Sequence, residues 1–553
     1  MIANGRRRLR PSRRRGRGRG RLLLLATALL PPLLACGGRA APSWPEDDIL
    51  VLALESAPMH LDPRVGTDAS SGRVAELMLM GMITKTPAGE LIPDLALSWD
   101  LLDGGRRYRF HLRPGVRFHD GRPLTAEDVA WTFNTMLDGT VASPKRGAFP
   151  QLERVTVVDP LTADFHLSSP YGALVVSLTA SMGIVPAGTM PEEFQANPVG
   201  SGPFRLVERR PDRVVLEAFD GYYGGRPRLD RVIVREIADA TVRALELRKG
   251  SVQLLVNALP PDLVPRFAAD PNFRVARSPG AYYTYLGMNL TDPILADVRV
   301  RRALAMAIDR ERLVETLWRG LGVPTETMLP PWHWARHHGL APIPHDPAGA
   351  RELLDRAGHP DPDGDGPLPR FTLVYKSTTD ETYMLQAQII QAMAAAAGIG
   401  IDIRTYEFAT FYADIKAGSF QLFSLTWFGV LDPDLYSQIF HSARIPPHGA
   451  NRGRYVNAEV DRLIEAGARR FDREERLPHY LKIQELLAEE LPYISLFNKF
   501  NAAVMAAPLA GYQNYPSGEL HSIKDMWWDR TVVVPSEAAP AANRGEDAAR
   551  TAG

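Results

Sequence analysis

The 553-residue chain has one cysteine, Cys36, so it cannot form an internal disulfide bond. It also lacks the short motifs of several large enzyme classes: a P-loop, a glycine-rich dinucleotide fingerprint and an H-E-x-x-H pair of zinc ligands. The apolar run at residues 22–34 includes two prolines and is too short to span a bilayer, which takes about 20 apolar residues. These absences disfavour an enzyme, and they disfavour a membrane-spanning helix at this position.

Acidic residues are missing from the first 21 positions, which contain ten arginines. The formal net charge of zero therefore hides an acidic body, because removing these ten from the 64 basic residues leaves 54 against 64 acidic residues. Nucleic-acid binding depends on neutralising phosphates with basic side chains. We therefore expect no nucleic-acid partner.

The arginine-rich segment and the apolar run that follows it are typical of an export signal. The next residues, Leu33-Leu34-Ala35-Cys36, resemble a lipoprotein processing site, in which cleavage before Cys36 leaves its thiol to be lipidated. We predict a lipoprotein signal peptide at residues 1–35 and an exported, periplasmic or cell-surface protein anchored to the membrane through lipidated Cys36. A plain secretory signal is the alternative, and Ser12-Arg13-Arg14 leaves twin-arginine export open.

Two segments are predicted to lie outside the folded body. Residues 36–47 are short, small and contain proline, which predicts a tether. Residues 536–553 are rich in Ala, Arg and Glu without an apolar period, which predicts a disordered tail.

Residues 96–133 contain a hairpin, a second turn and the start of a helix. Apolar and polar residues alternate at 108–113, which predicts a half-buried strand, and the preceding residues 103–105 (DGG) suit the positive φ of a hairpin turn. Thr125 and Asp128 predict a capping box at the start of the helix. These features describe a folding unit and carry no chemistry of their own.

The same stretch resembles a characteristic region of the family 5 extracellular solute-binding proteins of ABC importers, which bind peptides, dipeptides or nickel. Residues 200–206 (GSGPFRL) and 220–227 (DGYYGGRP) resemble a second characteristic region of this family, about 100 residues downstream. A Gly-Ser-Gly could also indicate a nucleophile elbow, but the G-x-S-x-G spacing is absent. The resemblance extends from about residue 48 to about residue 500.

The resemblance implies an α/β protein with the two-lobe periplasmic-binding-protein fold, in which mixed sheets are flanked by helices and an extra domain is added. It divides the chain into a first lobe at residues 48–87, 197–287 and 499–535, an extra domain at 88–196, and a second lobe at 288–498. The chain would cross between the lobes near Met288-Asn289 and near Asn498.

Two predictions concern the second lobe. Residues 371–376, 381–397 and 401–406 have the pattern of a strand, a helix and a strand, which predicts a parallel βαβ unit. Residues 472–490 have the pattern of a long helix, but Pro478 lies inside it and predicts a kink or an early end.

The resemblance places the ligand in the cleft between the lobes. It implies that a loop at residues 67–71 faces this cleft, ahead of an apolar helix at 74–82; a solvated serine-rich turn is the alternative. The ligand-binding residues that we expect are Thr67, Asp68, Ala69, Ser70, Ser71, Trp332, Trp334, Trp427, Phe428, Gly429, Val430 and Asp432.

Val430 bears on the charge of the ligand. In peptide-binding members of the family, an acidic residue three positions after an aromatic one pairs with the peptide's ammonium, and the resemblance identifies that aromatic as Trp427. A valine cannot compensate an ammonium that is removed from water. Either Asp432 makes this contact or the ligand has no free N-terminus. Trp427 could also belong to the core.

Two segments resemble metal sites. Residues 361–366 (DPDGDG) have the acidic spacing of an EF-hand loop, but Thr372 stands where the twelfth-position acid is required. Five histidines are loosely clustered without the fixed spacing of a zinc site: His333, His337, His338, His345 and His359. We interpret the first segment as a turn and the histidines as surface or cleft residues, and we expect no metal or cofactor.

The predicted function is that of a monomeric substrate-binding lipoprotein. It would capture a peptide or similar small solute between closing lobes and deliver it to the permease subunits of an ABC transporter. A ligand-sensing lipoprotein and a secreted metal-dependent hydrolase remain as alternatives.

Overall fold

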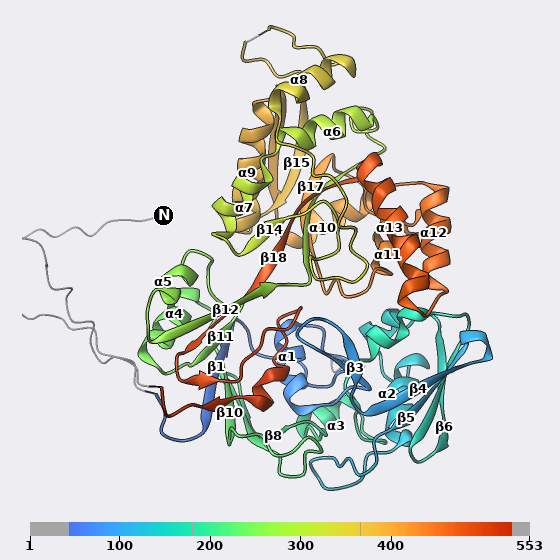
Figure 1. The fold of residues 1–553 in the computed structure, drawn as a ribbon, viewed down its shortest axis with the longest axis vertical. Helices are drawn as coiled ribbons and strands as arrows, with labels where there is room; N and C mark the ends of the chain where they lie inside the picture. Colours follow the sequence, from blue (N-terminus) through green and yellow to red (C-terminus); the bar gives the residue numbers. More distant parts are fainter. Residues whose placement is uncertain (1–43, 180–181, 365, 533–553) are drawn as a thin grey trace, which may run out of the picture. The chain divides into compact units, whose positions relative to one another are not determined.

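The computed structural model describes residues 44–179, 182–364 and 366–532, and a 12-stranded mixed sheet runs through it (Figure 1). One half of this sheet, with the helices that pack on it, is called the first lobe, and the other half the second lobe. The first lobe contains β1 (Ile49–Leu54), β8 (Phe204–Arg210), β9 (Arg213–Ala218), β10 (Arg231–Glu236), β11 (Leu254–Val256) and β12 (Phe273–Pro279). The second lobe contains β13 (Tyr282–Met288), β14 (Gly322–Pro324), β15 (Phe371–Thr378), β16 (Ile399–Tyr406) and β17 (Leu422–Phe428).

The long strand β18 (Tyr493–Ala506) belongs to both halves of the sheet. Its first part pairs with β13 and β14, and from Phe500 onward it pairs with β12. The partners therefore change next to Asn498, where the sequence predicts a crossing. The other change lies at residues 280–281, between β12 and β13, because all of β13 already pairs with β17. The strand pairing thus puts this crossing before β13, not after it at Met288-Asn289.

The first lobe combines parallel and antiparallel pairs. Strand β1 pairs in parallel with β10 and β11, whereas β8, β9 and β10 form an antiparallel run. Its helices are α1 (Ala69–Met78), α3 (Pro191–Ala196), α4 (Ala240–Lys249) and α5 (Val264–Ala268), and short strands are β2 (Ile83–Lys85), β3 (Leu91–Pro93), β19 (Leu509–Ala510) and β20 (Trp527–Trp528). Its buried side chains form a core around Leu50, Leu52 and Val234.

The second lobe contains the predicted βαβ unit, which is confirmed. Strands β15 and β16 pair in parallel over their full length, from Phe371 opposite Ile399 to Thr378 opposite Tyr406. The helices of this lobe are α6 (Val298–Ala307), α7 (Arg310–Trp318), α8 (Pro347–Arg356), α9 (Glu381–Ala395), α10 (Phe408–Ala417), α11 (Leu435–Phe440), α12 (Ala458–Ala468) and α13 (Arg473–Glu490).

The predicted early end of the last helix at Pro478 is wrong. Helix α13 contains Pro478 and continues to Glu490. A proline removes one backbone hydrogen bond, and here it stands only six residues into the helix. Buried Tyr480, Ile483 and Gln484 follow it and hold the helix against the lobe, so tertiary packing outweighs the local cost.

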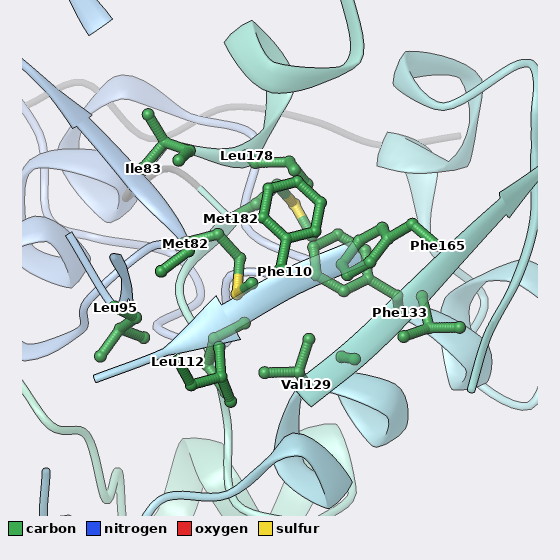
Figure 2. Close-up of a cluster of buried hydrophobic side chains, with 14 of the residues drawn as sticks. Met82, Ile83, Leu95, Phe110, Leu112, Val129, Phe133, Phe165, Leu178 and Met182 are labelled. Carbon is green, nitrogen blue, oxygen red and sulfur yellow. The ribbon is translucent and has the colours of Figure 1, made fainter. Parts of the chain in front are cut away.

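An antiparallel four-stranded sheet forms a second core, whose buried residues lie mostly between residues 80 and 184 and include Ile83 of the first-lobe strand β2 as well as Tyr222. Its order is β4 (Ala96–Leu102), β5 (Arg107–Leu112), β7 (Thr162–Leu167), β6 (Leu152–Asp159), and α2 (Ala126–Leu137) packs on it. Figure 2 shows Phe110, Phe133 and Phe165 gathered in this core, with ring centroids 4.9 Å apart for Phe110 and Phe165 and 5.1 Å apart for Phe133 and Phe165. We call this unit the four-stranded domain.

The local predictions for this domain are confirmed. Buried and half-buried residues alternate along β5, and the turn before it has positive φ at Asp103, Gly104 and Gly105. Thr125 and Asp128 form the capping box of α2, since the Asp128 carboxylate accepts from the Thr125 N–H at 2.7 Å.

Contacts between distant segments join the four-stranded domain to the second lobe. The Tyr171 hydroxyl donates to Asp434 Oδ2 at 3.0 Å. Phe471 packs on Tyr108, with ring centroids 6.0 Å apart, and a side chain at Gly105 would overlap its ring. Gly105 has φ +84° as well, so both the turn and this close approach require glycine.

The ends of the described chain meet in the first lobe. Trp44 lies against Phe273 and Trp528, so the folded body includes the last part of the segment predicted as a tether. Cys36, the signal peptide at 1–35 and the tail at 536–553 lie outside the described residues. Within residues 44–532, as far as they are described, no helix combines the length and apolarity needed to cross a membrane.

The buried ion pair of Asp62 and Arg64 links the first lobe to the four-stranded domain. Both side chains are fully buried, and Arg64 also donates to Thr135 on α2 at 3.1 Å and to the Thr189 carbonyl at 2.9 Å. We expect Arg64→Met to lower the free energy of unfolding by about 3–5 kcal/mol, because it leaves the Asp62 carboxylate buried without its cation. Thermal melts would measure the loss. The matched change Arg462→Met, in an exposed pair with Glu459, should leave the melting temperature nearly unchanged; equal effects of the two changes would contradict this role of Arg64.

Candidate functional site

A cavity of about 760 Å³ lies where the two lobes meet, and residues from both lobes and from the crossing strands line it. The first lobe contributes Thr67, Ala69, Gly72, Arg73, Glu76, Lys85, Asn257, Leu259, Pro261, Ser517, Gly518, Glu519 and His521. The second lobe contributes Tyr282, Trp318, Leu321, Phe428, Gly429 and Leu431, and β18 contributes Lys499, Phe500 and Ala502. Val176 and Thr179 complete the lining from the four-stranded domain.

Helix α1 begins earlier than predicted and forms part of the cavity wall. Asp68 caps it by accepting from the Ser71 N–H at 2.8 Å, so the helix starts at Ala69 and residues 69–71 are its first turn. The loop predicted at 67–71 is therefore mostly helical. Thr67 and Ala69 line the cavity, whereas Ser70 and Ser71 are buried; a solvated serine-rich turn is wrong.

The early start of α1 follows from its cap. Asp68 has the extended φ and ψ of an N-cap residue, and its carboxylate satisfies a helix N–H that would otherwise lack a partner. Because the helix starts at Ala69, Arg73 and Glu76 lie about one and two turns further along the same face, and both also line the cavity.

The end of β17 divides the predicted aromatic residues between two environments. Successive strand residues point to opposite faces. Phe428 lines the cavity and is 66% exposed, with its ring edge-on to Tyr282 at 5.5 Å. Trp427 is half-buried and packs against the second-lobe core, with the Arg452 guanidinium 4.8 Å from its ring, and it is not among the residues that line the cavity. The expectation that Trp427 faces the cleft is therefore not met.

The two predicted tryptophans of the 332–334 segment also lie away from the cavity. Trp332 donates from Nε1 to the Pro279 carbonyl at 3.0 Å. Trp334 lies edge-on to Tyr480 and within 5.3 Å of the Arg476 guanidinium. Both residues hold the loop against neighbouring elements, and neither lines the cavity.

Val430 and Asp432 do not offer a free carboxylate to the cavity. Val430 is fully buried in the second-lobe core, and its N–H donates to the Ala281 carbonyl at 3.1 Å. The Asp432 carboxylate accepts two hydrogen bonds from Arg476, at 3.0 and 2.6 Å. Bidentate pairs of this kind are among the stronger charge-assisted contacts, so Asp432 already has its cation.

Asp434, two residues further on, is half-buried next to Asp432. Its Oδ2 accepts from Tyr171, and its Oδ1 has no partner among the described residues. Burial, and then the negative charge of Asp432, raise the pKa of Asp434 to about 6. This group was missed because its partner lies 263 positions away in the chain.

A buried group of charges forms the first-lobe side of the cavity. Lys85 and Glu519 form an ion pair, and Glu76 accepts from the Leu520 N–H at 3.2 Å. Burial, and then the charge of Glu519, raise the pKa of Glu76 to about 7. Burial opposes ionisation of Glu519 as well, but the Lys85 ammonium holds the pKa of Glu519 below its usual range. Burial lowers the pKa of His521 to about 4, so this imidazole is neutral at pH 7.

On the opposite side, Lys499 stands where β18 changes partners. Its Nζ lies 4.0 Å from the ring centroid of Trp318 and 5.8 Å from that of Tyr282. Its carbonyl accepts from the Gly280 N–H at 2.9 Å, so the two crossings lie next to each other. Burial lowers the pKa of Lys499 to about 8.

The sequence contained signals for several of these missed residues. Tyr282 directly precedes a continuous apolar run at residues 283–290 (YTYLGMNL), and Lys499 directly follows the predicted crossing at Asn498. Residues next to a crossing lie where the two lobes meet, beside the cavity. The sequence did not indicate which of their side chains faces the cavity.

The histidines that were loosely clustered in the sequence do not gather at one site in the structure. His333 is buried and contacts the Leu431 carbonyl at 3.2 Å, whereas His337 lies 3.4 Å from Glu485. Across residues 44–532, insofar as the structure describes them, no three His, Cys, Asp or Glu side chains converge in a way that could hold a metal ion. In the acidic segment at 361–366, position 365 lies outside the described residues.

The glycines that raised the idea of a nucleophile elbow have a packing role. The Gly202 N–H donates to the Met78 carbonyl at 2.8 Å, at the end of α1. A side chain at Gly200 would overlap the same carbonyl. The Gly-Ser-Gly segment therefore lets two pieces of backbone approach closely.

Comparisons with known proteins agree with this architecture. Residues 90–445 match the family model described as bacterial extracellular solute-binding proteins, family 5, middle. The chain is 30% identical over 520 residues to the probable di/tripeptide-binding protein 5 of Pseudomonas aeruginosa strain UCBPP-PA14, covering 88% of this chain and 96% of that protein. It is 26% identical over 503 residues to the dipeptide-binding protein of Escherichia coli strain K12, covering 85% and 93%.

A solved structure matches as well. The oligopeptide-binding protein AppA from Bacillus subtilis, in complex with a nonapeptide, gives a TM-score of 0.71 at 27% identity and covers 87% of this chain and 98% of that one. The fold is thus that of the periplasmic binding proteins. The chain belongs to the family 5 bacterial extracellular solute-binding proteins.

The raised pKa of Glu76 predicts how stability depends on pH. Between about pH 4.5 and pH 7, the folded state keeps a proton on Glu76 that the unfolded state has lost, so this group's contribution to stability falls as the pH rises through that range. Glu76→Gln retains an acceptor for the Leu520 N–H and removes the ionisation. We expect it to raise the melting temperature more at pH 8 than at pH 4.5. Thermal melts across this range would measure the difference, with exposed Glu311→Gln as the control; an equal gain at both values would contradict the prediction.

Proposed function

We propose that the chain is the substrate-binding subunit of an ABC importer, which captures a peptide or similar small solute between its lobes and delivers it to a membrane permease. Its family membership supports a solute-binding role. The names of its relatives support peptides as the class of solute, since they include dipeptide- and di/tripeptide-binding proteins. The observation that carries the proposal is the 760 Å³ cavity, which is lined from both lobes around the crossing strands.

The mechanism follows from where the cavity lies. A ligand that contacts both lobes favours the closed arrangement, because only there are both sets of contacts made. Rotation would take place at residues 280–281 and 498–500, where the sheet partners change. Opening would break the contacts between the second lobe and the four-stranded domain, including the Tyr171–Asp434 hydrogen bond.

The rest of the proposal concerns location and partners. The mature chain is anchored to the membrane by a lipid on Cys36 and acts as a monomer outside the cytoplasm, without a cofactor or catalytic activity. A lipid-anchored sensor of the same solute is the second candidate, and a neighbouring pair of permease genes would favour transport over sensing. A secreted metal-dependent hydrolase would instead show activity that is lost when metal is stripped away.

Closure can be tested with the solute that the protein carries. Native mass spectrometry of protein purified without refolding should detect a bound solute. X-ray scattering should then give a smaller radius for this sample than for protein freed of solute by unfolding, dialysis and refolding. Tyr171→Phe, which removes one closing hydrogen bond, should shift the carried sample toward the larger radius. An unchanged radius with confirmed binding would show that the lobes do not close on the solute.

The lipid anchor makes a separate prediction. Cys36→Ser removes the thiol that would be lipidated, so the variant should appear as soluble protein or as unprocessed precursor. Fractionation of cells into membrane and soluble parts measures this outcome, with a serine substitution at Ala35 plus intact Cys36 as the control. Membrane association that persists in Cys36→Ser would rule out the anchor.

A further inference from the structure

The cavity contains a half-buried cation, Lys499, that forms no ion pair among the described residues. No carboxylate in the described part of the chain forms an ion pair with Lys499, although the charge of Asp380 acts on it; its ammonium lies over the rings of Trp318 and Tyr282. Aromatic faces attract a cation, but they do not neutralise it. Removing an ammonium from water is costly unless an opposite charge compensates it.

A second cation on the opposite wall has only a long ion pair. Arg73 lines the cavity from α1, its partner Glu55 is 3.8 Å away and 44% exposed, and its charge also acts on Glu76. An ion pair of this length and exposure leaves most of the guanidinium's field available to the cavity. Lys499 and Arg73 therefore present positive charge from the crossing strand and from the first lobe.

The carboxylates near the cavity are already committed. Glu519 pairs with Lys85, and Asp432 is held by Arg476 outside the lining. Glu76 is the remaining one, and burial raises its pKa to about 7, so it is partly protonated at neutral pH. The cavity thus has an excess of positive charge and no unpaired carboxylate suited to a ligand ammonium.

The cavity lining also contains an apolar surface next to these cations. Phe428 is exposed to the cavity, Tyr282 stands edge-on to it, and Leu431 and Phe500 lie in the same lining. This arrangement suits a solute with an apolar or planar group next to an anionic one.

We propose that the cleft selects solutes that carry a carboxylate, which pairs with Lys499 at the crossing between the lobes, while an apolar group packs against Phe428 and Tyr282. This inference rests on the proposed solute-binding function and names its class of solute. A free ammonium is not required, because neither carboxylate of the lining is free to pair with it: Glu519 pairs with Lys85, and Glu76 accepts from the Leu520 N–H. Lys499 stands on β18, the strand that both lobes share. The carboxylate of the solute would therefore be bound next to the residues about which the lobes close.

Four probes separate the two charges: Leu-Phe, N-acetyl-Leu-Phe and the C-terminal amide of each. Isothermal titration calorimetry with the wild-type chain should show that both acids bind at least tenfold more tightly than their amides, and that acetylation does not weaken binding. Lys499→Met should reduce the affinity for the acids to that for the amides. Lys416→Met is the matched control, because Lys416 also lies over a tyrosine ring, at 5.2 Å from Tyr412, but outside the cavity.

Equal binding of acids and amides, or a preference for acids that survives in Lys499→Met, would overturn the proposal. If none of the four probes binds, the solute carried through purification decides: an anionic solute lost in Lys499→Met supports the proposal, and a neutral or cationic one overturns it. A neutral solute that still closes the lobes leaves the transport function in place. Failure of all probes, together with no carried solute, counts against the proposed function itself.

Discussion

The constraint on which the rest of the structure depends is that one strand, β18, supplies hydrogen bonds to both halves of the sheet. Each backbone N–H and carbonyl of a buried strand needs a partner. Along 14 residues these partners change from β13 and β14 to β12 and β11. The halves must therefore meet at Asn498, Lys499 and Phe500. The cavity lies beside this junction, so the residues of the crossing become residues of the site.

The cations of the protein differ in whether the fold itself supplies a carboxylate to pair with them. Arg64, Lys85 and Arg476 each pair with a buried or nearly buried carboxylate, and each pair ties together segments of the fold. Breaking one of them would leave a charge in a poorly solvated place, which is why such pairs are kept. Lys85 and Lys499 both line the cavity, but Lys85 pairs with Glu519, whereas Lys499 has aromatic rings in place of a carboxylate. Because Lys499 has no ion-pair partner within the fold, its charge would be available to a solute in the proposed site.

The four-stranded domain takes part in the site although it supplies little of the lining. It contributes Val176 and Thr179 to the cavity, and it contacts the second lobe through Tyr171 and through the turn at Gly105. These contacts involve segments that are hundreds of residues apart, so each closes a long loop of chain only when the lobes are together. In the proposed closing motion, the domain would favour the closed arrangement through these contacts.

Local sequence patterns determined much of the fold. The alternation along β5, the capping box of α2 and the parallel pairing of β15 with β16 were all predicted, because strand period, helix caps and crossover handedness depend on neighbouring residues. The family resemblance added the order of the lobes and the existence of a cleft. Of the ligand-binding residues that it implied, Thr67, Ala69, Phe428 and Gly429 lie in the lining of the cavity.

Only the tertiary structure decided which side chains face that cavity and which charges are paired. Trp427 and Phe428 are adjacent in sequence but lie on opposite faces of β17, and Asp432 is occupied by Arg476, 44 positions away. The helix across Pro478 persists because buried residues beyond it outweigh a local cost. The sequence alone determined the elements, their order and the kind of protein they build. The three-dimensional fold determined which charges are left unpaired, since pairing depends on contacts between residues that the chain itself keeps far apart.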